Sequence, residues 1–189
     1  MTTICLIRHG ETDWNATGRL QGKTDIPLNQ TGIRQAEACA AFLDAADYDV
    51  LLASPLKRAR RTAEIINNEL QLPLVVMEDF KERSFGDGEG MTLEERRKKH
   101  PDKIFPNQEE IEDFTQRVIA GVNQITLDYP DKSVLLVAHG AVIKAILTHV
   151  SNGEIGHGKP KLLNACISNI HFKENKWNVK DYNRVEHLG

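Results

Sequence analysis

Short apolar runs recur along the chain and alternate with longer polar segments. The runs cover residues 4–7, 50–53, 74–76 and 133–138. A run this short, bounded by polar residues or glycine, is typical of a strand that is buried on both faces, as in a parallel sheet. The pattern therefore predicts four buried strands, with parallel pairing favoured.

The segments between these runs carry helical spacing and helix-start signals. Thr31 is expected to cap the first helix, which has an apolar face from Ile33 to Leu43. Ser54 and Pro55 suit the cap and the first position of the next helix. Helices are predicted over 31–43, from 54 onward, and over 92–99, 109–129 and 141–150. The helix at 92 begins with a capping box, Thr-x-x-Glu.

Two alternating runs close the chain, over 167–172 and 177–182. The four residues between them are polar, so the pair is predicted to form a hairpin at the edge of the sheet. Alternation of strands and helices before this hairpin places the chain in the α/β class. We find no internal repeat or linker, and 189 residues suit one core, so a single domain over 1–189 is expected.

Three irregular segments, 11–30, 78–91 and 152–161, interrupt the regular pattern. Long loops in compact domains are often functional, and apolar side chains such as Trp14 and Leu20 can anchor the first of them. We expect the loops over 11–30 and 78–105 to set substrate specificity.

Composition narrows the class of protein. A formal net charge of −3 gives no support to nucleic-acid binding. The first residues show no signal-peptide pattern, and no apolar stretch is long enough to span a bilayer, so a cytoplasmic protein without a membrane partner is expected. Cys5, Cys39 and Cys166 lie in apolar stretches and are expected to be free, buried thiols.

Cations and histidines follow several of the predicted strands. Arg8 and His9 follow the first strand, Arg58 lies near the start of the helix after the second, and His139 follows the fourth. The carboxyl ends of parallel strands meet at one edge of a sheet, where ligands of open α/β folds bind. Two guanidinium groups can hold phosphate oxygens, and a helix N-terminus adds N–H donors. These residues therefore predict a site for a phosphoryl group.

Each of these residues, taken alone, has a second explanation. Arg8 and His9 could be surface charges that end a strand, Arg58 one of several solvated cations, and His139 a hydrogen-bonded histidine at a strand end. A metal bound by His9 and His139 is disfavoured because the arginines repel a cation. Their repeated placement at strand ends favours a joint site.

Three segments carry a resemblance to a known family: Leu6-Ile7-Arg8-His9-Gly10-Glu11-Thr12 with Trp14-Asn15, Ser54-Pro55-Leu56-Lys57-Arg58-Ala59, and Ala138-His139-Gly140. Their order and separation resemble the histidine phosphatase superfamily, in its phosphoglycerate mutase-like branch. The resemblance covers residues 4–188. It implies a three-layer α/β sandwich with a mostly parallel central sheet, helices on both faces and a C-terminal edge hairpin.

The resemblance also implies roles at matching positions. His9 would be the nucleophile and Glu82 the proton donor, since Glu82-x-x-x-Gly86-x-x-Glu89-Gly90 matches that segment of the family. Phosphoryl and substrate contacts would come from Arg8, Asn15, Gln21, Gly22, Arg58, His139 and Gly140. One departure is Gly88, where many relatives carry a bulky aromatic residue, which leaves the pocket wall there undefined.

The expected function is a metal-independent phosphomonoester hydrolase that acts through a phosphohistidine on small phosphorylated metabolites, with no cofactor. Two alternatives stay open: a cofactor-dependent phosphoglycerate mutase and a non-catalytic module that binds a phosphorylated ligand. The pairing of His9 with Glu82 speaks against the module. Leu20-Gln21-Gly22 looks like the family's phosphatases, whereas Glu82-Arg83 looks like its mutases. Oligomeric state is not indicated.

The remaining chemistry-bearing residues suggest no further site. The charged run 94–99 is expected to be a solvated helix face. Five other histidines have no ligand spacing and are expected to be surface or packing residues: His100, His149, His157, His171 and His187.

Overall fold

The computed structural model describes residues 1–156 and 161–189. Its strands are β1 (Thr2–Arg8), β2 (Val50–Ala53), β3 (Leu74–Val76), β4 (Ser133–Ala138), β5 (Ile167–Lys173) and β6 (Lys176–Arg184). Its helices are α1 (Asp13–Ala16), α2 (Gln30–Phe42), α3 (Lys57–Leu70), α4 (Leu93–Lys99), α5 (Ile111–Asp128) and α6 (Gly140–Val150). All of the predicted strands are therefore confirmed, including the hairpin of β5 and β6.

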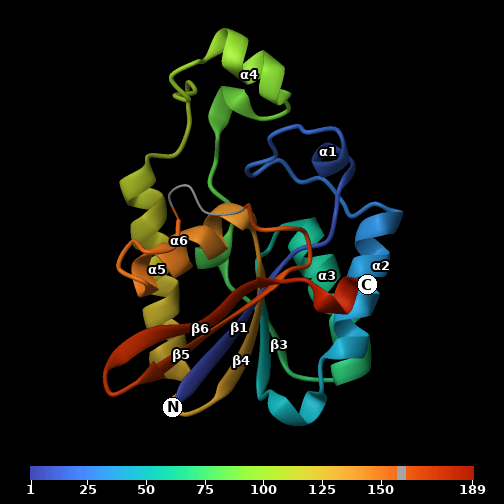
Figure 1. Cartoon of the computed structure of the whole chain (residues 1–189), viewed down its shortest axis with the longest axis vertical. Coiled ribbons are helices and arrows are strands. Elements are labelled where there is room, and N and C mark those ends of the chain that lie inside the picture. The colour runs from blue at the N-terminus through green and yellow to red at the C-terminus, as the bar shows by residue number, and fades with distance from the viewer. Residues whose placement is uncertain (157–160) are drawn as a thin grey trace.

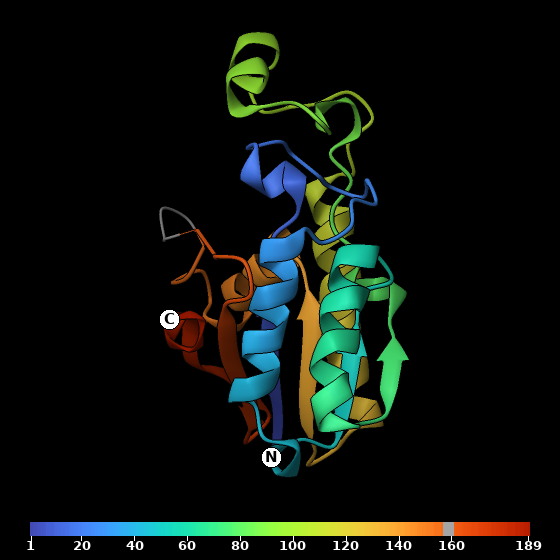
Figure 2. The ribbon, with the colours of Figure 1, turned by 90° about the vertical axis from the view of Figure 1, so that its right-hand side faces the viewer.

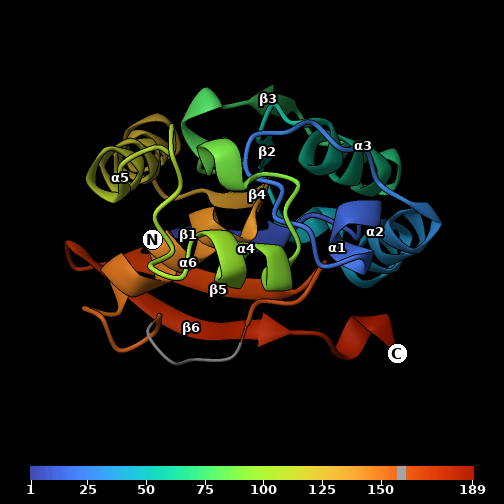
Figure 3. The ribbon, with the colours of Figure 1, turned by 90° about the horizontal axis from the view of Figure 1, so that it is seen from above.

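The strands form one mixed sheet of six, in the order β3-β2-β4-β1-β5-β6. β1, β2, β3 and β4 pair in parallel, and β5 and β6 add an antiparallel edge. Figure 3 shows this order from above, with α2 and α3 on one side of the sheet and α5 and α6 on the other. The three-layer α/β architecture with an edge hairpin is thus confirmed, and the carboxyl ends of β1, β2 and β4 share one edge.

Each central strand is apolar on both faces because each face has its own helical layer. In β1, Ile4 and Leu6 pack with the side chains of α5 and α6, such as Phe114. Cys5 and Ile7 face α2 and α3 instead, which lie in front of the sheet in Figure 2. Complete burial of such a side chain stabilises the fold by about 1.5–3 kcal/mol.

Two of the predicted helix caps are wrong. The first helix begins at Gln30 and is capped by Asn29, whose Oδ1 accepts from the backbone N of Gly32 at 2.9 Å. Asn caps at least as well as Thr, so the earlier residue takes the position. The second helix begins at Lys57 rather than at Ser54-Pro55, after an extended Leu56 with no side-chain cap.

The long segments lie above the carboxyl edge of the sheet. Figure 1 shows α1 and α4 at this end, opposite the N-terminus. The short helix α1 inside the 11–30 loop was not predicted, although its capping box of Thr12 and Asn15 is present in the sequence. The capping box of Thr92 and Glu95 is confirmed at α4. A bridge between Arg19 and Thr92 joins the two segments.

Other expectations have mixed outcomes. The three cysteines are free and buried, as expected. Among the described helices, none is long and apolar enough to cross a membrane. The loop expected over 152–161 is described only in part, and His157 lies outside the described residues.

Candidate active site

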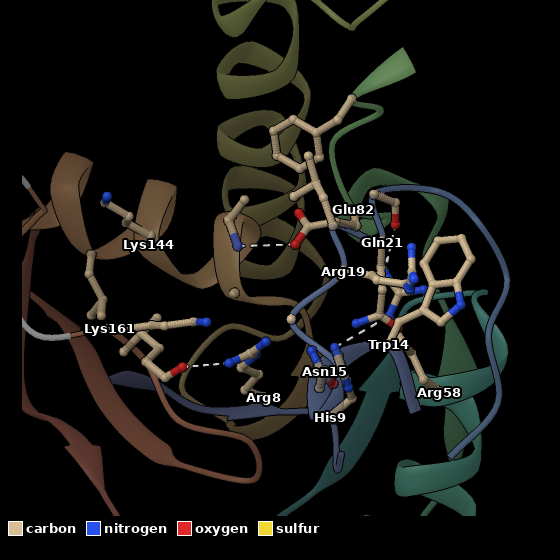
Figure 4. Close-up of a pocket in the computed structure, with 18 of the residues that line it drawn as sticks. Arg8, His9, Trp14, Asn15, Arg19, Gln21, Arg58, Glu82, Lys144 and Lys161 are labelled. Carbon is tan, nitrogen blue, oxygen red and sulfur yellow. Dashed lines mark hydrogen bonds between the residues drawn. The ribbon is translucent and has the colours of Figure 1, made fainter. Parts of the chain in front are cut away.

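A cavity of about 440 Å³ opens at the carboxyl edge of the sheet (Figure 4). All but one of the sequence-predicted site residues line it: Arg8, His9, Asn15, Gln21, Gly22, Arg58, Glu82 and Gly140. The exception is His139, whose ring is next to that of His9. Residues from β1, α3, α6 and two loops therefore meet in one place, as the strand-end argument predicts.

His9 follows the last residue of β1 and is 2% exposed. Its Nδ1 lies 2.6 Å from the carbonyl oxygen of Gly10. A carbonyl oxygen can only accept, so Nδ1 carries the proton and Nε2 is the unprotonated nitrogen with the lone pair. Burial and the positive charges of Arg58 and Arg8 lower the pKa of His9 well below its usual value. The imidazole is therefore neutral near pH 7.

Arg58 lies in the first turn of α3 and is almost completely buried. Its Nε donates to Nε2 of His9 across 3.3 Å. Its two terminal nitrogens donate to the carbonyl oxygens of Thr24 at 2.8 Å and Gly22 at 2.6 Å. Burial lowers its pKa to about 10, so the guanidinium still carries its charge at neutral pH.

Arg8 ends β1 and lines the same cavity. Its Nη1 donates to the carbonyl oxygen of Leu162 at 2.5 Å. Its buried Nε has no hydrogen-bond partner within the part of the chain that the structure describes. A Cβ at Gly140 would lie 3.4 Å from this nitrogen, so the glycine keeps the approach to Arg8 open.

His139 links β4 to α6 and is fully buried. Its ring centroid lies 5.3 Å from that of His9. Its Nε2 lies 2.7 Å from the hydroxyl of Ser54, and its Nδ1 has no partner among residues 1–156 and 161–189. Burial and the charge of Arg58 lower its pKa, so this ring is also neutral. Ser54 thus contacts the site, whereas the sequence assigned it to a helix cap.

Glu82 faces the cavity from the loop after β3, and its side chain is held at both oxygens. Oε1 accepts from the backbone N of Arg83 at 2.9 Å, and Oε2 from that of Ala141 at 3.1 Å. Burial raises its pKa above the usual value, although these two bonds oppose the shift. A carboxyl group in this setting can hold a proton at higher pH than an exposed glutamate.

Arg117 on α5 braces the backbone that carries Glu82, and the sequence did not single it out. Its Nη1 donates to the carbonyl oxygens of Asp79 at 2.8 Å and Lys81 at 2.6 Å. Its Nη2 donates to the carbonyl of Glu82 at 3.2 Å, and Nε to the Glu109 carboxylate at 2.8 Å. One guanidinium therefore holds three backbone carbonyl groups within residues 79–82.

Asn15 presents its amide N–H₂ group to the cavity because its oxygen is already used. Oδ1 accepts from the backbone N of Thr12 at 3.1 Å and from Nδ2 of Asn164 at 3.1 Å. Thr12 also donates its hydroxyl to Oε1 of Gln21 at 2.7 Å. Both amides are thus oriented with their oxygens toward the protein, which leaves donors for an anion.

Asn164 was not predicted as part of the site. Besides Asn15, its Nδ2 reaches the carbonyl oxygen of His9 at 3.1 Å. Ala165 adds a second donor to that carbonyl, from its backbone N at 3.1 Å. The C-terminal tail fixes this segment, since His187 Nε2 lies 2.9 Å from the carbonyl of Ala165. The three motif segments of the sequence end at residue 140, so none of them includes Asn164.

Glu89 joins the two loops that cover the site. Its carboxylate accepts from the backbone N of Lys23 at 3.2 Å and of Thr24 at 3.0 Å, and from that of Phe85 at 2.8 Å. Gly22 beside it has a φ of +56°, and a Cβ there would meet the Glu89 carboxylate. The turn that offers its carbonyls to Arg58 therefore depends on both residues.

The departure at Gly88 has a structural explanation. Gly88 is buried, and a Cβ there would lie 2.6 Å from the ring of Phe105. Phe105, which is 6% exposed, occupies the space into which a side chain at 88 would project. Phe105 thus supplies the aromatic packing against position 88. A second aromatic residue, Phe85, lines the cavity.

The charges of the site suit an oxyanion. Arg8 and Arg58 face a cavity in which Glu82 is the only carboxylate among the described lining residues. Within the same described part of the chain, no group of three His, Cys, Asp or Glu side chains is placed to hold a metal ion. A phosphoryl group can bind here through fixed cations and amide donors.

An α/β fold with a neutral histidine between two buried arginines, and a buried carboxyl group opposite, defines a phosphoryl-handling class of protein. Residues 4–185 match the model of the histidine phosphatase superfamily, branch 1. The chain belongs to this family.

Relatives of the chain agree with this assignment. Phosphatase PhoE of Bacillus subtilis, described as uncharacterized, is 55% identical over 188 residues, which span 100% of this chain and 97% of PhoE. The metal-independent phosphoserine phosphatase of Arabidopsis thaliana is 33% identical over 202 residues, spanning 100% of this chain and 84% of its own. The structure of Bacillus stearothermophilus YhfR superposes with a TM-score of 0.93 at 28% identity, and 100% of both chains is covered. These findings support an enzyme of the phosphatase class.

Proposed function

We propose that the protein is a phosphomonoester hydrolase that transfers the phosphoryl group to Nε2 of His9 and needs no metal. The observation that carries this proposal is the fixed tautomer of His9. Nδ1 donates to the carbonyl oxygen of Gly10 at 2.6 Å, which keeps the proton on that nitrogen. Nε2 is left unprotonated and accepts from Nε of Arg58. A neutral imidazole with an unprotonated Nε2 is a competent nucleophile toward phosphorus, once the incoming phosphoryl group replaces His9 as the acceptor of the Arg58 hydrogen bond.

The first step forms an N–P bond at Nε2 of His9 and breaks the ester P–O bond. Arg8, Arg58 and Asn15 line the cavity and meet the charge of the transferring group, which needs little more than positioning and fixed positive charge. The family resemblance gives His139, whose ring lies beside that of His9, a contact to the same group. Glu82 gives its proton to the departing alkoxide, which leaves as an alcohol. Its raised pKa supports the protonated state that this step requires.

The second step releases phosphate. Water attacks the phosphorus, Glu82 takes a proton from it, and the N–P bond breaks with its electron pair returning to His9. The enzyme is then restored for another cycle. Small phosphorylated metabolites suit a cavity of about 440 Å³, and the Arabidopsis relative named for phosphoserine supports the same class of substrate.

Rapid quenching during turnover of a ³²P-labelled phosphomonoester tests the proposal. Acid-labile, alkali-stable label should appear on the wild-type protein and be absent from His9→Ala. His149→Ala is the matched control, because this histidine is exposed on α6 and lies outside the cavity. Label that persists in His9→Ala would overturn the assignment, and so would activity that is lost in a chelator and restored by a divalent metal.

A further inference from the structure

The mouth of the cavity carries positive charge that the reaction at His9 does not use. Arg19, Arg96, Lys144 and Lys161 line the cavity together with the residues described above. Figure 4 shows Lys144 and Lys161 on one side of the pocket and Arg19 on the other, with Arg8 and His9 between them. These cations come from segments far apart in the sequence.

Arg19 and Arg96 are each anchored to one of two consecutive carbonyl groups. Nη1 of Arg19 donates to the carbonyl of Gly90 at 2.7 Å, and Nη1 of Arg96 donates to that of Met91 at 2.6 Å. The backbones are tied as well, since Leu20 N donates to Met91 O at 3.0 Å and Gly90 N to Leu20 O at 2.7 Å. Within residues 1–156 and 161–189, each guanidinium donates from one terminal nitrogen only, so further N–H donors remain for a ligand.

Lys161 lines the same cavity on the side of Arg8 away from Arg19. Its pKa is lowered by burial and by the positive charges of Arg8 and Arg96, so it is within electrostatic reach of both. The ion pairs formed within residues 1–156 and 161–189 include none of the cations at the mouth. Like charges gathered without a counter-ion destabilise the free protein, and a bound anion relieves this cost.

We propose that Arg19, Arg96 and Lys161 form an outer anion subsite that binds a second anionic group, carboxylate or phosphate, of a phosphomonoester whose reacting phosphate lies at His9. The inference rests on the proposed hydrolase function and names the substrate class. Guanidinium groups match carboxylate and phosphate oxygens through paired, charge-assisted hydrogen bonds. A neutral group at the same place would leave these donors unpaired, and a cationic group would be repelled, so the subsite selects for phosphomonoesters that carry a second anionic group.

Four short phosphate esters that differ at the far end test the subsite: propyl phosphate, 2-carboxyethyl phosphate, propane-1,3-diol bisphosphate and phosphocholine. We expect kcat/KM of the wild type for the two anionic esters to exceed that for propyl phosphate about tenfold or more, as for hydrogen bonds to charged groups. Phosphocholine should be the poorest substrate. The better of the two anionic esters identifies which group the subsite prefers.

Variants assign the preference to these residues. Arg96→Gln and Lys161→Gln should each reduce the ratio of kcat/KM for the anionic esters to that for propyl phosphate by about tenfold. Lys161 makes no side-chain hydrogen bond within the described chain, so its variant tests charge without loss of structure. Arg97→Gln is the matched control, because Arg97 is exposed on α4 and lies outside the cavity.

Equal kcat/KM for all four esters, or a preference that both variants retain, would overturn the inference. If the wild type hydrolyses no ester, including p-nitrophenyl phosphate, the proposed function fails instead. Calorimetric titration of the same four esters then decides the subsite alone: tighter binding of the anionic esters, weakened in Arg96→Gln, supports it, and equal binding refutes it.

Discussion

Arg58 donates from its Nε to Nε2 of His9 across 3.3 Å, and both side chains are almost completely buried. The bond occupies the lone pair that would attack phosphorus. A phosphoryl group arriving at this position can replace it, because its oxygens are stronger acceptors for a guanidinium than an imidazole nitrogen is. Burial, and after it the charge of Arg58, lowers the pKa of His9 and so keeps the ring neutral.

The first prediction concerns the shape of this guanidinium. Arg58→Lys keeps the charge but removes the fork that bonds His9, Gly22 and Thr24 together. We expect kcat/KM to fall about 10²–10³-fold, as for loss of one preorganised donor to a transition state. Arg61→Lys on the exposed side of the same helix is the control. A change of less than threefold would mean that charge alone suffices at position 58.

The second prediction is the pH dependence of kcat/KM. His9 must be neutral, so activity rises as pH increases through its lowered pKa. Glu82 must be protonated, so activity falls as pH increases through its raised pKa. An alkyl phosphate should therefore give a bell-shaped profile with its maximum on the acid side of neutrality. The ionisation of the substrate is measured separately by ³¹P NMR. Activity that still increases between pH 7 and pH 9 would contradict both assignments.

The third prediction separates acid catalysis from binding at Glu82. Glu82→Gln keeps an oxygen for the backbone N of Ala141 but has no proton to give. Turnover of alkyl phosphates, whose alkoxide leaves poorly, should slow by about 10²–10⁴-fold. Activated aryl phosphates should lose much less. Glu78→Gln, in the same loop, serves as the control. Equal losses on both kinds of substrate would indicate a role in binding or structure.

The strand-end argument predicted only residues beside regular elements, whereas Asn15, Gln21, Gly22 and Glu82 in the loops were predicted through the family resemblance. Arg8, His9 and His139 could be placed because parallel strands end at one edge. Ser54 could not, because a serine before proline suits a helix cap equally well, and the choice depends on His139 being 2.7 Å away. Asn164 was not predicted for a similar reason. It precedes β5 in the chain, and the antiparallel pairing of β5 with β1 brings it to the site. Sequence spacing carries no signal for contacts between loops.

A fourth prediction follows from Asn164, a positioning residue whose amide joins the backbone of His9 to the side chain of Asn15. Asn164→Ala should lower kcat/KM about tenfold by releasing the Asn15 amide, the effect of a lost buried hydrogen bond. If Asn164 acts through Asn15, the same substitution should cost much less in an Asn15→Ala background. Asn68→Ala, on the exposed surface of α3, is the control. Additive effects in the double variant would show that the two asparagines act independently.

The last prediction separates a phosphatase from a mutase. A mutase must retain a bisphosphorylated intermediate and keep water away from the phosphohistidine, which requires chain that covers the site. In the connection between β3 and β4, α5 packs against the sheet. The part of this connection that lies at the cavity end of the molecule is the segment that contains α4 (Figure 1), which leaves little chain to cover the site.

With 3-phosphoglycerate and catalytic 2,3-bisphosphoglycerate, any turnover should therefore release inorganic phosphate and form little 2-phosphoglycerate. Phosphate release and isomerisation are measured in the same reaction, with His9→Ala as the blank. Rapid isomerisation that depends on the bisphosphate, with negligible phosphate release, would establish the mutase instead, because it would mean that water is excluded from the phosphohistidine during reorientation of the intermediate.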